Sequence, residues 1–269
     1  MRKIKEISSL QNPLIKKIFL LKEKSRERKK TGLFVLEGVR ELELALKGNY
    51  KINTLLYLEH LISKENISKL FQGRELPELI SLSKIVYQKL AYRQTTEGII
   101  AIAQSKIHAL NKLRLNSESP LILVAEAPEK PGNIGALLRT ADAANLDAVI
   151  IADPKGDLYN PNIIRSSIGC IFTNTIATGS AEEIIAFLKK NEISIFTASL
   201  KASKNYSEID FAGPSAIVMG TESTGLTSIW VNNNDQNIII PMSGQIDSMN
   251  VSVSAAILIF EAKRQRNFN

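Results

Sequence analysis

The stretch LILVAEAPEKPGNIGALLRT, residues 121–140, carries the pattern that decides the fold. It begins with an uninterrupted apolar run, Leu121–Ala125, which is typical of a strand buried on both faces. After the loop EAPEKPG, apolar residues recur at helical spacing from Pro131 onward. A buried strand that leads into an amphipathic helix is the repeating unit of an α/β domain.

The helix expected after this loop has one arginine apart from its apolar face. At about 100° per residue, the apolar positions cluster on one side; they are Ile134, Leu137, Leu138 and Ala141. Arg139 lies away from that side, with Gly135 and Ala143 four residues before and after it. A solvent-facing arginine usually has charged or long neighbours. Arg139 instead stands between two small residues, which the helical pattern does not explain.

The same alternation continues to the end of the chain. Apolar strands are predicted over residues 148–152, 194–198, 216–219 and 237–240, and helices over residues 162–168, 181–191 and 250–266. Continuous apolar strands that alternate with helices predict a parallel sheet with both faces covered.

The first half has shorter elements of the same kinds. Strands are predicted over residues 33–36, 52–58, 79–82 and 98–103, and helices over residues 39–46 and 62–71, after a basic helix near the start. The polar, weakly patterned residues that follow are typical of a linker. We therefore expect a small α/β domain over residues 1–105, a linker over 106–118 and a second α/β domain over 119–269.

Composition excludes several classes of protein. The chain has 269 residues, one cysteine (Cys170) and two histidines (His60 and His108). A disulfide framework is impossible, and a Cys/His zinc site or histidine-driven acid–base chemistry is disfavoured. No apolar run is long enough to cross a bilayer, and the charged start lacks the features of a signal peptide. We expect a cytoplasmic protein that has neither a metal nor a membrane as its partner.

The positive charge is concentrated near the N-terminus. Residues 1–30 contain eleven Lys or Arg and three Glu, so they hold a net charge of +8, while the whole chain has +7. We expect this arm to contact the phosphates of a nucleic acid, through Lys16, Lys17, Lys22, Arg26, Arg28, Lys29 and Lys30. The alternative is a solvated amphipathic helix without a partner.

Two further loops follow predicted strands. VMGTESTGL, residues 218–226, has Gly220 and Gly225 at the spacing of a phosphate loop, but Leu226 stands where that loop needs lysine. A nucleotide triphosphatase is therefore disfavoured, and an NAD enzyme is disfavoured because no G-x-G-x-x-G is present. Glu222 lies between the two glycines, either as a capping residue or as a site carboxylate.

The last loop lies in IIIPMSGQIDSMNVSVSAA, residues 238–256. Ser248 and Asn250 stand where the final helix begins, so both are candidate N-cap residues. The free N–H groups of the same helix start also offer a binding place to a polar or negatively charged group of a ligand.

Taken in order, the three loops resemble the motifs of the SpoU/TrmH family of RNA ribose 2′-O-methyltransferases. The matching patterns are N-x-G-x-x-x-R from Asn133, G-x-E-x-x-G-L from Gly220 and I-P-M-x-G-x-x-x-S-x-N-V-S from Ile240. The resemblance covers about residues 119–266. Residues 1–105 resemble the substrate-binding domain found ahead of it, through FVLEG (34–38) and TTEGIIAIA (95–103).

The resemblance implies a fold and an assembly. It implies a SPOUT α/β domain with a deep trefoil knot around a parallel sheet, preceded by a small ribosomal-protein-like α/β domain. It also implies a homodimer packed through the knotted domain. The apolar face of the final helix is a candidate contact, through Val251, Ala255, Leu258 and Ala262, unless it packs on its own sheet.

The resemblance also assigns the site. S-adenosylmethionine is expected to lie in the knot, held around Gly220, Ile240, Met242 and Met249. The residues assigned to catalysis are Asn133, Arg139, Glu222, Ser248 and Asn250. Arg139 is expected to bind the ribose phosphate and to stabilise the developing alkoxide, although the family proposal makes this arginine a base.

The expected activity is transfer of a methyl group from S-adenosylmethionine to a ribose 2′-hydroxyl in structured RNA, with 23S ribosomal RNA as the substrate. The alternatives are a tRNA 2′-O-methyltransferase and a non-catalytic RNA-binding protein that keeps the knotted fold. An unrelated nucleotide-binding α/β enzyme is a third possibility, which the missing lysine and the missing dinucleotide motif disfavour.

Overall fold

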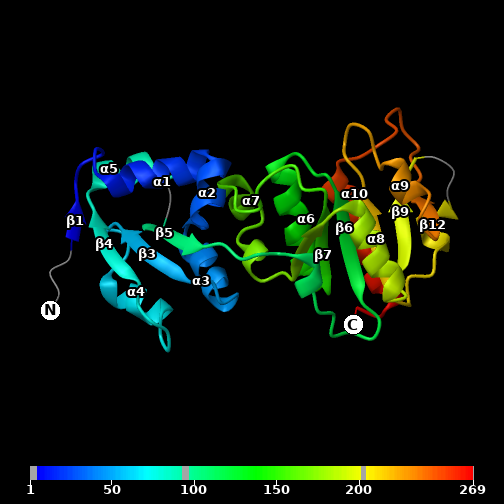
Figure 1. Cartoon of the computed structure of the whole chain (residues 1–269), viewed down its shortest axis with the longest axis horizontal. Coiled ribbons are helices and arrows are strands. Elements are labelled where there is room, and N and C mark those ends of the chain that lie inside the picture. Colours follow the sequence, from blue (N-terminus) through cyan, green and yellow to red (C-terminus); the bar gives the residue numbers. More distant parts are fainter. Residues whose placement is uncertain (1–4, 93–96, 201–203, 269) are drawn as a thin grey trace. The chain divides into compact units, whose positions relative to one another are not determined.

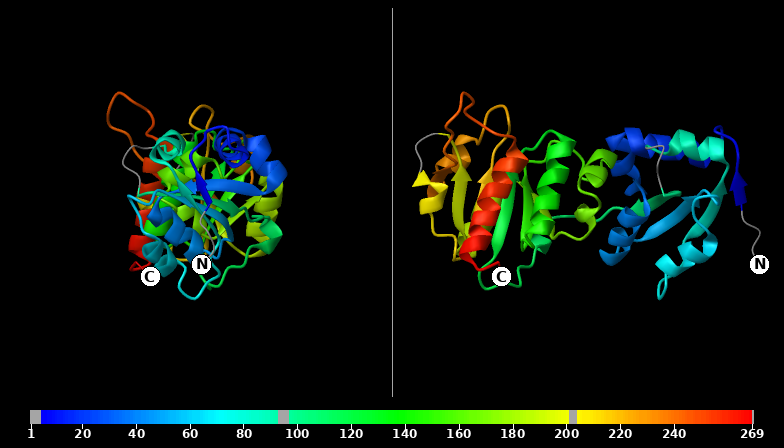
Figure 2. Two further views of the ribbon diagram at one scale, coloured as in Figure 1. Left: turned by 90° about the vertical axis from the view of Figure 1, so that its left-hand side faces the viewer. Right: turned by 180° about the vertical axis from the view of Figure 1, so that it is seen from behind.

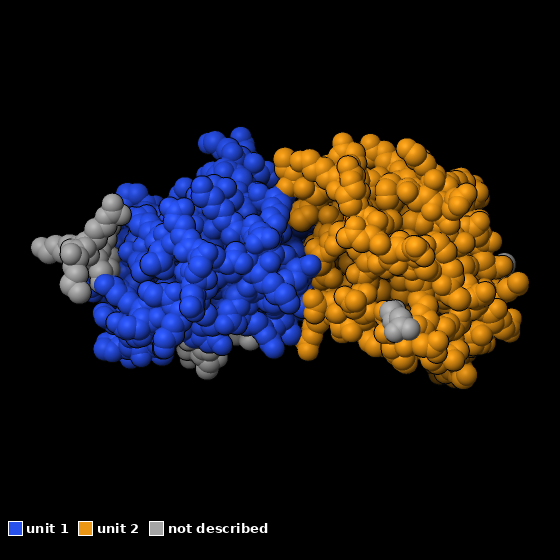
Figure 3. All heavy atoms as spheres, turned by 90° about the horizontal axis from the view of Figure 1, so that it is seen from below, with its two compact units in different colours: residues 1–106, 157–173 blue, residues 107–156, 174–269 orange. Residues whose placement is uncertain are grey.

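The computed structural model describes residues 5–92, 97–200 and 204–268. Contacts divide the chain into two compact units, coloured separately in Figure 3. Unit 1 comprises Met1–Lys106 and Asp157–Thr173, and unit 2 comprises Ile107–Gly156 and Asn174–Asn269. Of the motif TTEGIIAIA, residues 95 and 96 lie outside the described ranges.

Unit 2 is built on a parallel sheet. Within the described ranges, seven strands lie in the order β10-β12-β9-β11-β6-β7-β8, and every neighbouring pair is parallel (Figure 1). Their bounds are β6 Leu121–Glu126, β7 Ala148–Ala152, β8 Ile176–Gly179, β9 Ser194–Ala198, β10 Lys204–Asn205, β11 Ser215–Met219 and β12 Gln236–Ile239. The parallel sheet predicted from the apolar runs is confirmed.

Helices cover both faces of this sheet. They are α6 (Pro131–Ala143), α8 (Ala181–Lys190), α9 (Ser228–Val231) and α10 (Val251–Gln265), with the short turns η1 (Leu110–Lys112) and η3 (Tyr206–Glu208). One face of β6 packs with Ile184 of α8 and Trp230 of α9. The other face is covered by α6 and α10, which lie side by side in front of the sheet in the right-hand view of Figure 2. The apolar face predicted for α6 is buried at all four positions: Ile134, Leu137, Leu138 and Ala141.

Unit 1 has a mixed sheet. Five described strands lie in the order β1-β4-β3-β5-β2, and β5 runs antiparallel to both of its neighbours. The strands are β1 (Lys5–Ile7), β2 (Leu33–Glu37), β3 (Ile52–Tyr57), β4 (Glu78–Leu82) and β5 (Ile99–Gln104). The helices are α1 (Pro13–Glu23), α2 (Ser25–Thr31), α3 (Val39–Lys47), α4 (Lys64–Leu70), α5 (Lys84–Leu90) and α7 (Pro161–Ser166), followed by η2 (Cys170–Phe172).

The basic arm is two helices rather than one. Lys24 adopts an extended conformation, with φ −110° and ψ 109°, and so separates α1 from α2. In α1, Ile15, Ile18 and Leu21 are buried, which places the intervening lysines toward solvent. Charge and apolar spacing predicted helical structure here, but they contain no signal for the break at Lys24.

Residues 157–173 pack with unit 1 although they follow strand β7 of unit 2. Asp157 forms a buried ion pair with Arg28, whose side chain is only 4% exposed. The same guanidinium donates to the backbone oxygens of Leu21, at 2.6 Å, and Lys22, at 3.2 Å. The prediction that Arg28 contacts RNA is therefore wrong, because its hydrogen-bonding groups are used inside unit 1.

Aromatic rings complete this attachment. The rings of Phe34 and Tyr159 stack with centroids 4.5 Å apart, and Tyr50 meets Phe172 edge-on at 5.0 Å. A Cβ on Gly48 would lie 1.9 Å from the backbone oxygen of Phe172, so only glycine permits this approach. Residues 157–173 thus supply part of the core of unit 1, whereas the sequence pattern had grouped them with 119–269.

The predicted linker also has a defined place. Leu113 is buried in the core cluster of unit 2, and the backbone oxygen of His108 accepts a hydrogen bond from the backbone N–H of Thr178 at 2.6 Å. Residues 107–118 therefore lie with unit 2. Their polar composition concealed this packing, since only a few leucines take part in it.

Replacing Arg28 by methionine should destabilise the protein by about 3–5 kcal/mol, because Asp157 is left buried without its charge partner. Arg26→Met, a change at an exposed arginine of the same helix, should alter stability by no more than about 0.5 kcal/mol. Chemical denaturation of the two full-length variants measures the difference. Equal stability would show that the Arg28–Asp157 pair does not hold residues 157–173 on unit 1.

Candidate active site

Three loops of unit 2 lie at one edge of its sheet. They follow β6, β11 and β12, whose carboxyl ends lie at the same edge because all these strands are parallel. In open sheets of this kind, ligands bind beyond the carboxyl ends of the strands. These loops are the three segments that the sequence singled out.

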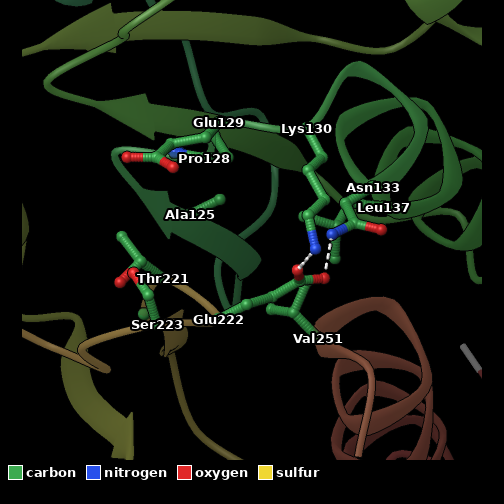
Figure 4. A pocket seen from close by; sticks show the side chains of 11 residues that line it. Ala125, Pro128, Glu129, Lys130, Asn133, Leu137, Thr221, Glu222, Ser223 and Val251 are labelled. Atoms are coloured by element: carbon green, nitrogen blue, oxygen red, sulfur yellow. Dashed lines mark hydrogen bonds and ion pairs between the residues drawn. The ribbon is translucent and has the colours of Figure 1, made fainter.

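The Glu222 carboxylate joins the loops. Its Oε2 pairs with the ammonium of Lys130, and its Oε1 accepts hydrogen bonds from the side-chain amides of Asn133 and Asn250, the latter at 3.2 Å. The Asn250 amide also donates to Oδ1 of Asn133 at 3.2 Å. Figure 4 shows the Lys130 and Asn133 side chains directed at Glu222. The structure therefore brings together three of the five residues predicted for catalysis.

Local structure explains where the two asparagines stand. Asn133 is the third residue of α6, which begins with Pro131 at a position that suits proline. Asn250 is the N-cap of α10, and its Oδ1 accepts from the backbone N–H of Ser252 at 3.0 Å. The N-cap prediction for Asn250 is confirmed, and its amide group also reaches Glu222.

The loop that carries Glu222 is a tight turn. Thr221 and Gly225 exchange backbone hydrogen bonds of 3.0 and 3.1 Å, and Gly225 has a φ of +69°. A Cβ on Gly220 would lie 2.3 Å from the backbone carbon of Gly225, so this position requires glycine. The turn holds Glu222 at its tip.

A buried carboxylate fixes the far end of this turn. Glu126, the last residue of β6, is 3% exposed and accepts hydrogen bonds from the backbone N–H of Thr227, at 2.9 Å, and from its hydroxyl, at 2.5 Å. Sequence reasoning missed both residues. The available signal was a glutamate that continues an apolar strand, which marks a carboxylate in need of a buried partner.

A pocket opens beside the Glu222 network. It has a volume of about 380 Å³, within the range of small-molecule sites. Its wall combines the small residues Ala125 and Gly220, the apolar Leu137 and Val251, and the polar groups of Lys130 and Glu222 (Figure 4). Apolar walls with a few convergent polar groups are typical of ligand sites.

The network lowers the pKa of the Glu222 carboxyl below its ordinary value. The hydrogen bond from Lys130 is the largest cause, followed by the bond from Asn133 and the positive charge of Lys130, while partial burial acts in the opposite direction. Glu222 is therefore ionised at neutral pH and presents acceptors only.

Other predicted site residues lie apart from this network. Arg139 is exposed on α6, six residues beyond Asn133, and Ser248 is exposed with its hydroxyl 3.2 Å from Asp247. Neither is among the described residues that line the pocket. Of the four residues predicted to hold the cofactor, Gly220 lines it; Ile240, Met242 and Met249 are half-buried elsewhere in the loops.

The basic arm is only partly available to a nucleic acid. Lys16, Arg26, Lys29 and Lys30 are exposed, and Lys17 is half-exposed. Lys22 is different, because its ammonium donates to the backbone oxygen of Leu90 and lies 3.8 Å from the Glu37 carboxylate. Its burial lowers the pKa of the Lys22 ammonium. The prediction that Lys22 contacts RNA is corrected, as it is for Arg28.

The face of α10 proposed for a dimer packs within unit 2. Ala255, Leu258 and Ala262 are fully buried, and Val251 lines the pocket. The apolar residues that α10 does expose are Val253 and Phe260. The spacing showed an apolar stripe, but it did not show which neighbour covers that stripe.

The described residues contain neither a membrane-spanning helix nor a cluster suited to a metal ion. None of their helices has the length and apolar character needed to cross a bilayer. Among them, no group of three or more His, Cys, Asp or Glu is placed to hold a metal ion.

The Glu222→Gln variant tests the charge of the network. A carboxyl whose folded pKa is lowered adds stability that is present above its unfolded value, about 4.3, and is lost as the pH falls through the folded value. The difference in melting temperature between wild type and Glu222→Gln should therefore shrink from pH 7 to pH 3. Glu129→Gln, at an exposed carboxyl of the same pocket, is the control. If the difference in melting temperature between wild type and Glu222→Gln were the same at pH 7 and pH 3, the lowered pKa of Glu222 would be contradicted.

Known families match both parts of the chain. The profile of the SpoU rRNA Methylase family matches residues 120–260, and that of the MRM3-like substrate binding domain matches residues 12–101.

Curated relatives match nearly full length. The chain is 28% identical to the 23S rRNA (guanosine(2553)-2′-O)-methyltransferase RlmP of Bacillus subtilis, over 97% of this chain and 100% of that protein. It is 30% identical to the 23S rRNA (guanosine-2′-O-)-methyltransferase RlmB of Haemophilus influenzae, over 81% of this chain and 96% of that protein.

Solved structures agree. A crystal structure described as an RNA 2′-O ribose methyltransferase is 37% identical, with a TM-score of 0.84, over 97% of this chain and 99% of that one. The AdoMet-bound rRNA methyltransferase of Sinorhizobium meliloti is 27% identical, with a TM-score of 0.87, over 97% of this chain and 98% of that one.

Proposed function

Because the chain belongs to the SpoU rRNA methylase family, we propose that it transfers a methyl group from S-adenosylmethionine to a ribose 2′-hydroxyl of 23S ribosomal RNA. The observation that carries this proposal is the meeting of Asn133, Glu222 and Asn250, one from each motif, beside a single pocket. The names of the relatives favour ribosomal RNA over tRNA.

The pocket suits the cofactor. Its wall offers small and apolar residues together with two carboxylates, those of Glu129 and Glu222, and the ammonium of Lys130, a combination that fits a ligand with both apolar and charged parts. We assign Gly220 of the pocket wall to holding it, and Ile240, Met242 and Met249, which lie outside that wall, to holding the part of the cofactor that extends beyond the pocket. When bound, S-adenosylmethionine supplies a methyl group activated by its positively charged sulfur.

The chain's own residues align the ribose. Arg139 presents an exposed guanidinium on α6, which binds the phosphate beside the target ribose and stabilises negative charge on the 2′-oxygen. Asn133, Glu222 and Asn250 hold the loops in register, and the exposed hydroxyl of Ser248 contacts the substrate. Alignment of this kind supplies much of the acceleration in a group transfer.

Unit 1 carries the RNA-binding surface. We assign phosphate contacts to the accessible residues of α1 and α2: Lys16, Lys17, Arg26, Lys29 and Lys30. This agrees with the match of residues 12–101 to a substrate-binding domain. Because the substrate is ribosomal RNA, we place the protein in the cytoplasm.

Two structural features belong to the proposal. The trefoil knot implied by the family is assigned to unit 2. A homodimer is assigned to the exposed apolar side of α10, where Val253 and Phe260 lie seven residues apart and therefore on one side of the helix.

Methyl transfer to 23S rRNA, measured with tritiated S-adenosylmethionine, tests the function. Arg139→Ala should fold normally and bind the cofactor, since Arg139 is exposed and lies outside the pocket wall. Its rate should fall by about 100- to 1,000-fold, because one electrostatic donor is lost.

Arg139→Lys is the sharper variant. Lysine keeps the charge but lacks the planar donor fork, so the rate should stay severely reduced. A rate for Arg139→Lys near that of wild type would show that charge alone matters. Normal methylation by Arg139→Ala would remove Arg139 from the site, and no transfer by wild type would leave an RNA-binding protein without catalysis.

Sedimentation equilibrium tests the dimer. Wild type should sediment as a dimer at micromolar concentration, and Phe260→Asp should shift it to monomer, because an apolar contact cannot bury an unpaired charge. Phe268→Asp, at an exposed phenylalanine beyond the end of α10, should remain dimeric. A monomeric wild type would overturn the assignment.

A further inference from the structure

We propose that Lys130 is a positioning residue for methyl transfer, and that its ammonium orients the Glu222 carboxylate against the amides of Asn133 and Asn250. This inference rests on the proposed function, since it assigns Lys130 a part in that reaction. Neither the three motifs nor the spacing of the loops pointed to Lys130.

Lys130 occupies a position that is unfavourable for a cation unless a negative charge lies nearby. It is the N-cap of α6, where Ser, Thr, Asp or Asn is preferred, and its side chain makes no capping hydrogen bond. The N-terminus of a helix carries partial positive charge, so a cation there is disfavoured. The Glu222 carboxylate offsets both the ammonium and the helix end, because it contacts Lys130 and Asn133 together.

The backbone of Lys130 is held while its side chain crosses the site. Its carbonyl oxygen accepts from the N–H groups of Asn133, at 3.0 Å, and Ile134, at 3.2 Å. Its side chain reaches the turn after β11, 92 residues further along the chain. The backbone of Lys130 is therefore fixed relative to α6, and its ammonium is placed by the contact with Glu222.

The two carboxylate oxygens have separate partners. Oε2 of Glu222 meets Lys130, whereas Oε1 accepts from both Asn133 and Asn250. With Oε2 occupied, rotation of the carboxylate is restrained and Oε1 stays directed at the two amides. Because Asn250 also begins α10, the orientation set by Lys130 extends to the starts of both helices.

This ion pair is poorly suited to stabilising the fold. The Lys130 side chain is 71% exposed and that of Glu222 is 28% exposed, so water screens the pair and its contribution to stability is small. Loss of Lys130 should therefore alter the site and leave the fold intact, which makes its role measurable in the folded full-length protein.

The kinetic test compares three variants in methyl transfer to 23S rRNA. Lys130→Met should lower kcat by between about 10- and 100-fold, as expected for misplaced reacting groups, with KM for RNA within twofold of wild type. Lys130→Arg should recover most of kcat, because it keeps a cation at the same place. Lys190→Met, at the exposed last residue of α8, should match wild type.

A second measurement does not depend on catalysis. Because Lys130 is the main cause of the lowered pKa of Glu222, NMR titration of the Glu222 carboxyl should give a higher pKa in Lys130→Met than in wild type or Lys190→Met. If wild type transfers no methyl group to the RNA, the proposed function fails, while this titration still tests whether Lys130 governs Glu222. Should Lys130→Met unfold, Lys130→Gln replaces it in both experiments.

Three results would overturn the proposal. An unchanged kcat in Lys130→Met would show a surface ion pair without a role in the reaction. A raised KM for RNA with a flatter salt dependence and an unchanged kcat would show that Lys130 binds an RNA phosphate directly. An unshifted pKa of Glu222 would exclude the orienting contact itself.

Discussion

The parallel alignment of the strands in unit 2 is the constraint on which the site depends. Every strand of that sheet ends at the same edge, so the loops after β6, β11 and β12 meet there although they lie far apart in the sequence. Parallel strands need crossover helices, and those helices cover both faces and leave the edge open. The edge is thus the natural place for a ligand, and the three motifs of the SpoU family all lie at it.

At that edge, the Glu222 carboxylate connects the three loops that the sheet brings together. Glu222 contacts the start of α6 through Lys130 and Asn133 and the start of α10 through Asn250. These two helices pack side by side on one face of the sheet. Glu126, buried beneath the same loop, holds its far end through Thr227. These contacts hold the three loops in a fixed geometry around the pocket.

Unit 1 is assembled from two separate parts of the chain. Its family profile spans residues 12–101, but its packing includes residues 157–173 from the other half of the chain. The buried Arg28–Asp157 pair and the rings of Phe34 and Tyr159 make that attachment specific. Because Arg28 of the basic arm is used in this way, fewer charges of the arm reach solvent than its charge count suggests.

The sequence alone determined the buried face of α6, the parallel sheet and the three loops that carry the family motifs, but it did not predict strand β8 or helix α5. Apolar periodicity reports that a residue is buried, because burial repeats with the period of the element. Apolar periodicity does not show which residue packs against the buried one. Only the tertiary structure decided that Lys130 meets Glu222 and that Arg28 meets Asp157, since 92 and 129 residues separate these partners and contacts over such distances leave no local pattern. For the same reason, only the fold decided that residues 157–173 pack with unit 1 and that the apolar stripe of α10 is covered by its own unit.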